Sequence, residues 1–149
     1  MSNARVQPVR KITAKRFRVS RARTGLGLFA TARIEKGARI VEYTGPRIPT
    51  PEAKAREHKH SSRYMFRIDR AKTIDGSPRT NQARYANHAC RPNARAVLTG
   101  NRIHLHARRM IQPGEEITYN YGREYFDFFF RDSGCRCTTC LQRPDKARR

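Results

Sequence analysis

The four cysteines of this 149-residue chain are unevenly placed. Cys135, Cys137 and Cys140 crowd together near the C-terminus in a Cys-x-Cys-x-x-Cys pattern, whereas Cys90 stands alone in mid-chain. A small secreted protein would spread an even number of cysteines through its disulfide framework. The tight C-terminal spacing is also poor for disulfides among the three. The pattern instead favours thiolates that converge on one metal ion.

Two glycines near the N-terminus let the backbone come close to another group. The segment Gly25-Leu-Gly-Leu-Phe-Ala30 formally matches the G-x-G-x-x-A fingerprint of dinucleotide-binding folds. That fold needs a buried strand before the glycines and a helix after them. Residues 16–23 are too charged to be buried on both faces, and no apolar stripe of helical period precedes Gly37. We therefore reject a dinucleotide fold.

The elements that must position these residues are short. From Phe17 onward, β-like runs are separated by glycine and proline, and no internal repeat is visible. The segments expected to be strands include 39–43, 64–68, 96–98, 102–106 and 116–119. One short helix is expected at 51–57, with Pro51 in its first turn and Thr50 as N-cap. The sequence thus predicts one mainly β domain with little helix and a modest core.

The charge of the chain is strongly positive, at +21. Residues 1–23 hold eight Lys or Arg and no acid, and we expect 1–14 to be a disordered basic arm and 144–149 a basic tail. Such a surface attracts polyanions over a Debye length of about 8 Å. One interpretation is contact with nucleic acid, or with a substrate bound to it, through the basic arm. The other is a basic protein with solvated tails.

No run of the sequence suggests a membrane partner. None approaches the roughly 18 apolar residues of a membrane span, and the N-terminal residues lack the apolar core of a signal peptide. We expect an intracellular protein, which would be cytoplasmic in a bacterium and nuclear, at chromatin, in a eukaryote.

Four segments appear in an order that resembles a known family. They are Thr24-Gly-Leu-Gly-Leu28, Glu42-Tyr-Thr-Gly45, Ala83-Arg-Tyr-Ala-Asn-His-Ala-Cys-Arg-Pro-Asn93 and Gly114-Glu-Glu-Ile-Thr-Tyr-Asn-Tyr121. This order resembles the SET-domain protein-lysine methyltransferases, whose motifs read G-x-G, E-Y-x-G-E, R-F-x-N-H-S-C-x-P-N and G-E-E-L-T-F-D-Y. The C-terminal cysteines resemble the family's post-SET zinc module.

The resemblance covers residues 17–142 and implies a division of the chain. It places a SET domain at 15–124 and a post-SET segment with the zinc site at 125–143. The implied fold is a mainly β SET fold with a pseudoknot, in which the Asn-His and Tyr-x-Tyr segments cross. Such threading is an exception among protein folds. No cysteine-rich segment precedes the SET-like motifs in this sequence, so the resemblance implies a minimal SET protein.

Several positions depart from the family pattern. Pro46 stands where the family usually has Glu, Ala89 replaces Ser, and Asn120 replaces Asp. Tyr85 and Tyr119 occupy positions that are often Phe. None of these changes removes a group that the chemistry needs.

The resemblance implies S-adenosylmethionine as the methyl donor. The implied cofactor-binding residues are Gly25, Leu26, Gly27, Leu28, Tyr64, Arg84, Asn87, His88, Tyr121 and Leu141. We expect Arg84 to support the site by pairing with a buried carboxylate such as Glu42, the alternative being a surface arginine. We expect Leu141 to cover the adenine, the alternative being ordinary packing.

Five of the six tyrosines are Tyr43, Tyr64, Tyr85, Tyr119 and Tyr121. Tyrosines on strands often serve only core packing. The family, however, builds an aromatic channel through which a lysine reaches the cofactor from the opposite face. By resemblance the main catalytic residue is Tyr121, with Tyr43 and Tyr119 lining the channel and Tyr64 touching both cofactor and channel. The apolar run 125–130 is expected to pack on the core and line the channel, or else to bury against a second subunit.

The resemblance also implies the metal ligands. Cys90, Cys135, Cys137 and Cys140 would form a closed structural zinc site that pins the C-terminal segment beside the Asn-His segment. The alternative is four free cysteines. A metal site at His104 and His106 is a weaker idea, because an i, i+2 histidine pair is usually a solvated strand face.

The predicted function follows from these implications. The chain would be an S-adenosylmethionine-dependent lysine methyltransferase acting on a histone or histone-like protein. It would chiefly add one methyl group, because a hydroxyl at Tyr119 can hold a water where a further methyl would go. One alternative is a catalytically inactive SET-like zinc module that binds nucleic acid. Another is an interaction domain that dimerises through its aromatic run, and monomer and homodimer both stay open.

Overall fold

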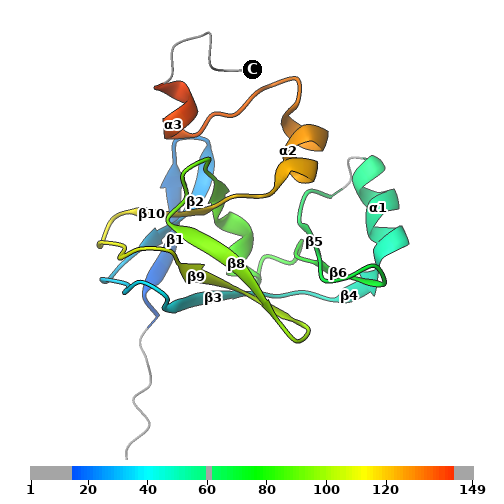
Figure 1. Ribbon diagram of the computed structural model, residues 1–149, viewed down its shortest axis with the longest axis horizontal. Helices are drawn as coiled ribbons and strands as arrows, with labels where there is room; N and C mark the ends of the chain where they lie inside the picture. Colours follow the sequence, from blue (N-terminus) through cyan, green and yellow to red (C-terminus); the bar gives the residue numbers. More distant parts are fainter. Residues whose placement is uncertain (1–14, 60–61, 143–149) are drawn as a thin grey trace, which may run out of the picture.

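The computed structural model describes residues 15–59 and 62–142, so the arm expected at 1–14 and the tail expected at 144–149 lie outside the described residues (Figure 1). The described chain is built mostly of short strands, which confirms the mainly β prediction. The strands are β1 (Phe17–Ala22), β2 (Gly25–Ala30), β3 (Arg39–Tyr43), β4 (Arg47–Pro49), β5 (Met65–Arg67), β6 (Lys72–Asp75), β7 (Asn87–His88), β8 (Ala94–Thr99), β9 (Arg102–Ala107) and β10 (Glu116–Tyr119).

The first sheet has the order β1-β2-β10-β7 and holds the glycine, Asn-His and Tyr-x-Tyr segments together. β1 and β2 form an antiparallel hairpin, and β10 pairs antiparallel with β2, with Ile117 opposite Leu28. β7 runs parallel to β10, so that Tyr119 lies opposite His88. Two segments about 30 residues apart in the chain are therefore neighbours in the sheet. The glycines lie in a strand, not before a helix, as the rejection of a dinucleotide fold requires.

Two further sheets, β3-β9-β8 and β4-β6-β5, complete the strand framework. β8 and β9 form the hairpin expected around the turn at 99–101. The largest core cluster joins the sheets through buried side chains such as Leu28, Ile34, Leu105 and Ile117. A second cluster packs Tyr43 against Ile74, Ala83 and Ile103. Tyr43 thus belongs both to the core and to the wall of the site described below.

The expected helix at 51–57 is confirmed as α1 (Thr50–His58), but the prediction for its N-cap is wrong. Pro49 occupies the N-cap position, and no side chain caps the helix. The hydroxyl of Thr50 instead donates to the carbonyl of Asp69 at 3.1 Å and lies 2.9 Å from the Thr73 hydroxyl. Thr50 therefore ties the start of the helix to β6, because buried hydroxyls need partners that the helix end does not supply here.

Three helical segments were not expected from the sequence. They are the 3-10 helix Gln82–Tyr85, α2 (Arg123–Phe130) and α3 (Thr138–Leu141). Aromatic residues have only modest helix propensity, so the run at 125–130 has no local signal that distinguishes helix from strand. α2 lies beside α1, and the rings of His58 and Phe128 are 5.4 Å apart (Figure 1). Among the described helices, none has the length and apolarity needed to cross a membrane.

Candidate active site and metal centre

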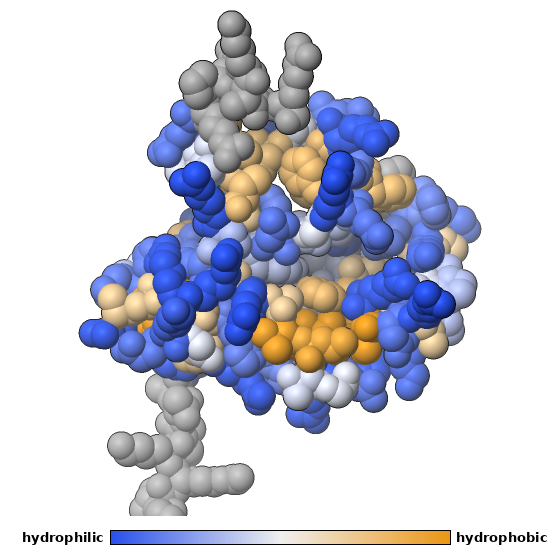
Figure 2. Space-filling model, in the orientation of Figure 1, coloured by the Kyte–Doolittle hydropathy of each residue, from blue (hydrophilic) through white to orange (hydrophobic). Residues whose placement is uncertain are grey.

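A cavity of about 580 Å³ opens between α1, α2 and β5. Figure 2 shows the hollow, with hydrophilic side chains around its edge. Five of the predicted site residues line it together, namely Tyr43, Tyr64, Arg84, Tyr119 and Tyr121. They come from β3, the segment before β5, the 3-10 helix, β10 and the segment just after β10. The fold therefore gathers these residues from distant parts of the chain around one space of ligand size.

The inner wall of the cavity is a set of packed aromatic rings. The ring of Phe66 lies 5.1 Å from that of Tyr43 and 6.3 Å from that of Tyr119. The hydroxyl of Tyr43 donates to the carbonyl of Tyr64 at 2.7 Å. A Cβ atom at Gly76 would overlap the ring of Tyr43, so the ring can take this position only beside glycine. These contacts hold the wall rigidly, because each ring is fixed by neighbours on two sides.

Tyr121 is held at both ends. Its backbone N–H donates to Nδ1 of His88 at 3.1 Å, and its hydroxyl donates to the carbonyl of Ala86 at 2.6 Å. Its ring lies 4.9 Å from the Tyr119 ring and 5.0 Å from the Tyr125 ring. The side chain consequently spans from the Asn-His segment to the cavity in a fixed orientation.

Burial sets the protonation of these groups. It is the main cause that raises the pKa of the hydroxyls of Tyr43, Tyr119 and Tyr121 above the ordinary value, and the neighbouring tyrosines add to the effect. The pKa of Tyr125 is raised for the same main reason. Burial also lowers the pKa of His88, which favours the neutral ring that accepts from Tyr121. At neutral pH the hydroxyls therefore act as hydrogen-bonding groups and not as phenolate bases.

Apart from Leu141, the remaining residues predicted to bind the cofactor lie on the neighbouring strands β2 and β7, and the backbone of Tyr121 donates to His88 on β7. The amide of Asn87 donates to the carbonyl of Leu26 at 3.0 Å and to Oε1 of Glu116 at 2.8 Å. Gly25 has φ of +124°, and no atom lies within 4 Å of the place a Cβ would take. Gly25 is exposed, and its positive φ favours glycine at this strand start, so the backbone there is accessible to a ligand.

Three other residues predicted to bind the cofactor differ in which of their atoms are accessible to it. At Gly27 a Cβ would come within 2.7 Å of Glu116 Oε1, so the close approach is to this carboxylate. The side chain of Leu28 is fully buried in the core, which leaves only its backbone for ligand contact. Leu141, on α3, is 41% exposed, so part of its side chain is open to a ligand, and both its predicted contact with the adenine and ordinary packing stay open.

The predicted pairing of Arg84 with Glu42 is wrong. The Arg84 guanidinium lies 4.0 Å from the centre of the Tyr64 ring, and its NH1 donates to the carbonyl of Ser77. Its Nε is buried without a hydrogen-bond partner among the described residues. Glu42 instead lies beside Arg102 and His104, at 3.8 and 3.9 Å. Stacking on a tyrosine ring satisfies a guanidinium where the carboxylate lies too far away.

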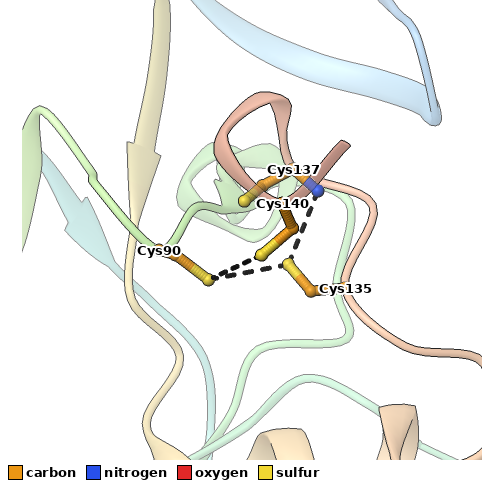
Figure 3. Close-up of side chains that lie close together, drawn as sticks. All are labelled: Cys90, Cys135, Cys137 and Cys140. Carbon is orange, nitrogen blue, oxygen red and sulfur yellow. Dashed lines mark hydrogen bonds between the residues drawn. The ribbon is translucent and has the colours of Figure 1, made fainter. Parts of the chain in front are cut away.

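The four cysteines converge on one point (Figure 3). Their Sγ atoms all lie within 4.8 Å of one another, with Cys90 at 3.4 Å from Cys140 and 3.8 Å from Cys135. Zn–S bonds of about 2.3 Å in a tetrahedron place the sulfurs about 3.8 Å apart. Burial raises the pKa of Cys90, and that of Cys135 to about 11, whereas at Cys137 burial is outweighed by hydrogen bonds from its neighbours, which lower the pKa to about 6. A bound cation would therefore be needed to hold Cys90 and Cys135 as thiolates at neutral pH. The cluster can thus hold a metal ion, and its four thiols suit zinc.

Two further predictions concern the histidine pair on β9 and the aromatic run at 125–130. His104 and His106 have ring centres 6.4 Å apart, and neither belongs to a metal-binding group among the described residues. The aromatic run forms α2, and Phe128 and Phe129 line the cavity with Tyr125. No residue of α2 is fully buried, so the helix covers the cavity without entering the core.

Some residues of the site carried no clear signal in the sequence. Asn81 is buried, accepts from the N–H of Thr44 at 3.1 Å and donates to the carbonyl of Gly76 at 3.0 Å. It thereby joins two segments behind the cavity, and no local pattern marks such a role. Phe66 lies in a run with the alternation of a strand, but only its neighbours identify it as a wall residue. Glu116 lies within the Gly114–Tyr121 motif, but the motif does not indicate that its carboxylate accepts a hydrogen bond from Asn87.

Comparison with known proteins identifies the sequence pattern independently. Residues 25–122 match the family model of the SET domain. A histone-lysine N-methyltransferase, set-2 of Caenorhabditis elegans, is 41% identical over 121 residues, which is 74% of this chain and 8% of that protein. The human H3 lysine-36 specific histone-lysine N-methyltransferase is 37% identical over 109 residues, 67% of this chain and 4% of that protein.

A fungal relative has a similar identity and coverage. The H3 lysine-4 specific histone-lysine N-methyltransferase of Eremothecium gossypii is 35% identical over 123 residues, 74% of this chain and 13% of that protein. The chain therefore spans only a small part of the length of each of these relatives.

Proposed function

This chain belongs to the SET domain family, and from that membership we propose that it transfers a methyl group from S-adenosylmethionine to the side-chain amine of a lysine in another protein. The observation that carries the proposal is the position of Tyr121. Its hydroxyl, backbone and ring connect the Asn87-His88 segment on one side with the tyrosine-lined cavity on the other. A donor on the first side and an acceptor on the second would meet at this residue.

The cavity suits a lysine that must react as a neutral amine. The pKa of a free lysine is about 10.4, so removing its proton at pH 7 costs roughly 4–5 kcal/mol. Inside a dry wall formed by Tyr43, Phe66 and Tyr119, the charged form loses its hydration, and the pKa of the amine falls. Neutral tyrosine hydroxyls orient the lone pair and hold the amine for an in-line attack. No strong general base is required.

The proposed cofactor supplies, when bound, a methyl group made electrophilic by its sulfonium sulfur. The residues expected to hold it are Asn87, His88 and the backbone of 25–28, with Leu141 over the adenine. The hydrogen bond from the Asn87 amide to the carbonyl of Leu26, which joins these two segments, supports this position. Tyr64 and Arg84 lie on the cavity side of Tyr121, and we propose that they shape the passage between the two halves of the site.

We propose that the cysteine cluster holds one structural zinc ion. The ion would join Cys90, two residues after His88, to the C-terminal segment that carries α2 and α3. Purified protein should contain about one zinc per chain. Elemental analysis of protein purified without chelators checks this, and absence of bound metal would contradict it.

We propose that the chief product is monomethyl-lysine. Among the described residues, the Tyr119 hydroxyl has no hydrogen-bond partner, whereas those of Tyr43 and Tyr121 each donate to a backbone carbonyl. A free hydroxyl at this wall can hold a water beside the lysine nitrogen, and displacing that water costs free energy. An added barrier of about 1.4 kcal/mol slows a further methylation tenfold.

The substrate follows from the relatives' names. They are named for acting on histones, so a histone or histone-like protein is the proposed substrate class. Action on histones would place the protein at chromatin in a eukaryotic cell. Contact with nucleic acid through residues 1–14 stays a prediction outside the described residues.

Methylation of a lysine-peptide array with labelled S-adenosylmethionine tests the activity directly. We expect label on some lysine peptides with the native chain and none with the matched peptides in which arginine replaces lysine. Calorimetry with the cofactor separates this function from an inactive zinc module: measurable binding supports the enzyme, and a silent titration supports the binding module.

A further inference from the structure

The mouth of the tyrosine-lined cavity carries a surplus of positive charge. Its charged lining residues are the cations Lys54, Arg63, Arg67, Arg84 and Arg123 and the acids Glu57 and Glu124. The cations come from separate elements around the cavity, namely α1, the segment leading into β5, the end of β5, the 3-10 helix and the start of α2. A peptide that inserts a lysine here must lay its flanking residues between them.

Two of these cations are free to meet such a peptide. Lys54 and Arg63 are exposed, and neither forms an ion pair with any described residue. Arg63 is also positioned, because its guanidinium lies 5.4 Å from the centre of the Phe129 ring and its carbonyl accepts from the hydroxyl of Tyr125 at 2.6 Å. Positive charges on α1 and beside α2 are thus presented to the opening without an ion pair among the described residues.

The two acidic lining residues, Glu57 and Glu124, do not cancel the positive charge at the opening. Glu57 is partly buried, and burial raises the pKa of its carboxyl, which weakens it as an anion. It also lies close to Lys54 on the same helix. Glu124 is exposed in the first turn of α2, next to Arg123. Arg123 lies 3.7 Å from Asp127, and Arg84 is stacked on Tyr64 inside the cavity. Even with both lining carboxylates ionised, the exposed cations Lys54, Arg63 and Arg67 keep the opening positive, on a chain whose net charge is +21.

We propose that the acceptor lysine lies in a segment whose flanking residues are acidic. The inference rests on the proposed lysine methylation and names the substrate class for the same cavity. The amine enters the aromatic interior while the neighbouring residues stay at the charged rim. Asp or Glu there complement Lys54 and Arg63, whereas a strongly basic tail is repelled by them and by the chain as a whole. Within the histone-like class, this selects acidic segments over free basic tails.

Two peptides of equal length test the proposal. Both carry one central lysine, with two Glu on each side in the first and two Arg on each side in the second. Binding to the full chain is measured by fluorescence anisotropy, and methylation by mass spectrometry, at low and at physiological salt. At low salt we expect the affinity for the acidic peptide to be about tenfold higher than that for the basic peptide, as two exposed ion pairs would give. The difference should shrink at physiological salt, because salt screens exposed charges.

Charge reversal locates the preference. The double variant Lys54→Glu, Arg63→Glu should abolish or invert the preference for the acidic peptide. The matched control Arg18→Glu, Arg21→Glu makes the same change in net charge on exposed residues of β1, which do not line the cavity. The control should retain the preference. Circular dichroism and cofactor affinity show that each variant is folded.

The outcomes separate this inference from the proposed function. Equal or tighter binding of the basic peptide by the native chain overturns the inference, and so does a preference that survives Lys54→Glu, Arg63→Glu but disappears in the control. If the acidic peptide binds more tightly through these two residues and neither peptide is methylated, the charge preference stands and the proposed methylation is contradicted.

Discussion

The two walls of the cavity are held in different ways. On one side, Tyr43 and Tyr119 are buried in strands β3 and β10 and belong to the core clusters. On the other side, α2 contains no fully buried residue, and its rings contact one another and the exposed face of the site at His88 and Tyr121. The short helix α3, which follows it in the chain, likewise has no buried residue. Short segments without a core are usually held by metal or disulfide. The hydrophobic core therefore positions the tyrosines of the site, whereas the cysteine cluster positions the C-terminal helices beside it.

The largest effect is expected on the core-held side. Tyr121→Phe removes the hydroxyl that donates to Ala86, which frees the ring to move at the meeting point of the two half-sites. A displacement of about 1 Å at such a point can cost about 100-fold in rate. We expect kcat to fall by this order while the fold, followed by circular dichroism, is unchanged.

Tyr85→Phe is the control for that loss. It removes the same group from a residue that does not line the cavity. A similar fall in kcat for both variants, or none for Tyr121→Phe, would show that the hydroxyl of Tyr121 has no special role.

The next effect is expected on the metal-held side. Cys140→Ser removes one of the four sulfurs and should release the proposed zinc, so that α3 with Leu141 loses its position. We expect cofactor affinity, measured by calorimetry, to fall by about 10-fold or more, while the strands keep their stability. Ser133→Ala, an exposed change in the same segment, should alter neither quantity. If Cys140→Ser destabilises the whole fold equally, the two walls are not independent.

A smaller and more specific effect is expected at Tyr119. Tyr119→Phe removes the hydroxyl that has no partner among the described residues and keeps the buried ring. We expect activity to persist and the product to shift toward dimethyl- and trimethyl-lysine, because the site loses a water that blocks further transfer. Mass spectrometry of a peptide over time measures the shift. Trimethyl-lysine as the main early product of the native chain would contradict the water hypothesis.

The smallest effect on the site is expected from the N-terminal arm. Deletion of residues 1–14, which lie outside the described residues, should leave cofactor affinity nearly intact. Binding of a labelled oligonucleotide should weaken, and its affinity in the native chain should fall steeply with salt if the contact is electrostatic. Binding that barely changes between low and physiological salt would refute this account.

Several strands, the first helix and the identity of the chemical groups could be predicted from the sequence alone. Turn residues and alternating runs predicted β3 and β10 with the bounds that the structure has. They also predicted the β8–β9 hairpin, although its strands at 94–99 and 102–107 are longer than the expected 96–98 and 102–106. Cysteine spacing predicted a metal group, and the structure brings the four sulfurs together. These features could be predicted because each depends on residues close together in the sequence. The exception is Cys90, which was assigned to the metal site through the order of the motifs along the chain.

Only the tertiary structure decided which groups meet. Arg84 lies on Tyr64 and not beside Glu42, because their distance depends on how the 3-10 helix packs against β3. Thr50 donates to Asp69 in place of capping its helix, since a neighbouring strand offers a partner. The aromatic run forms a helix because rings from α1 and the cavity wall pack on one of its faces. Such contacts join residues far apart in the chain, and local propensity carries no information about them.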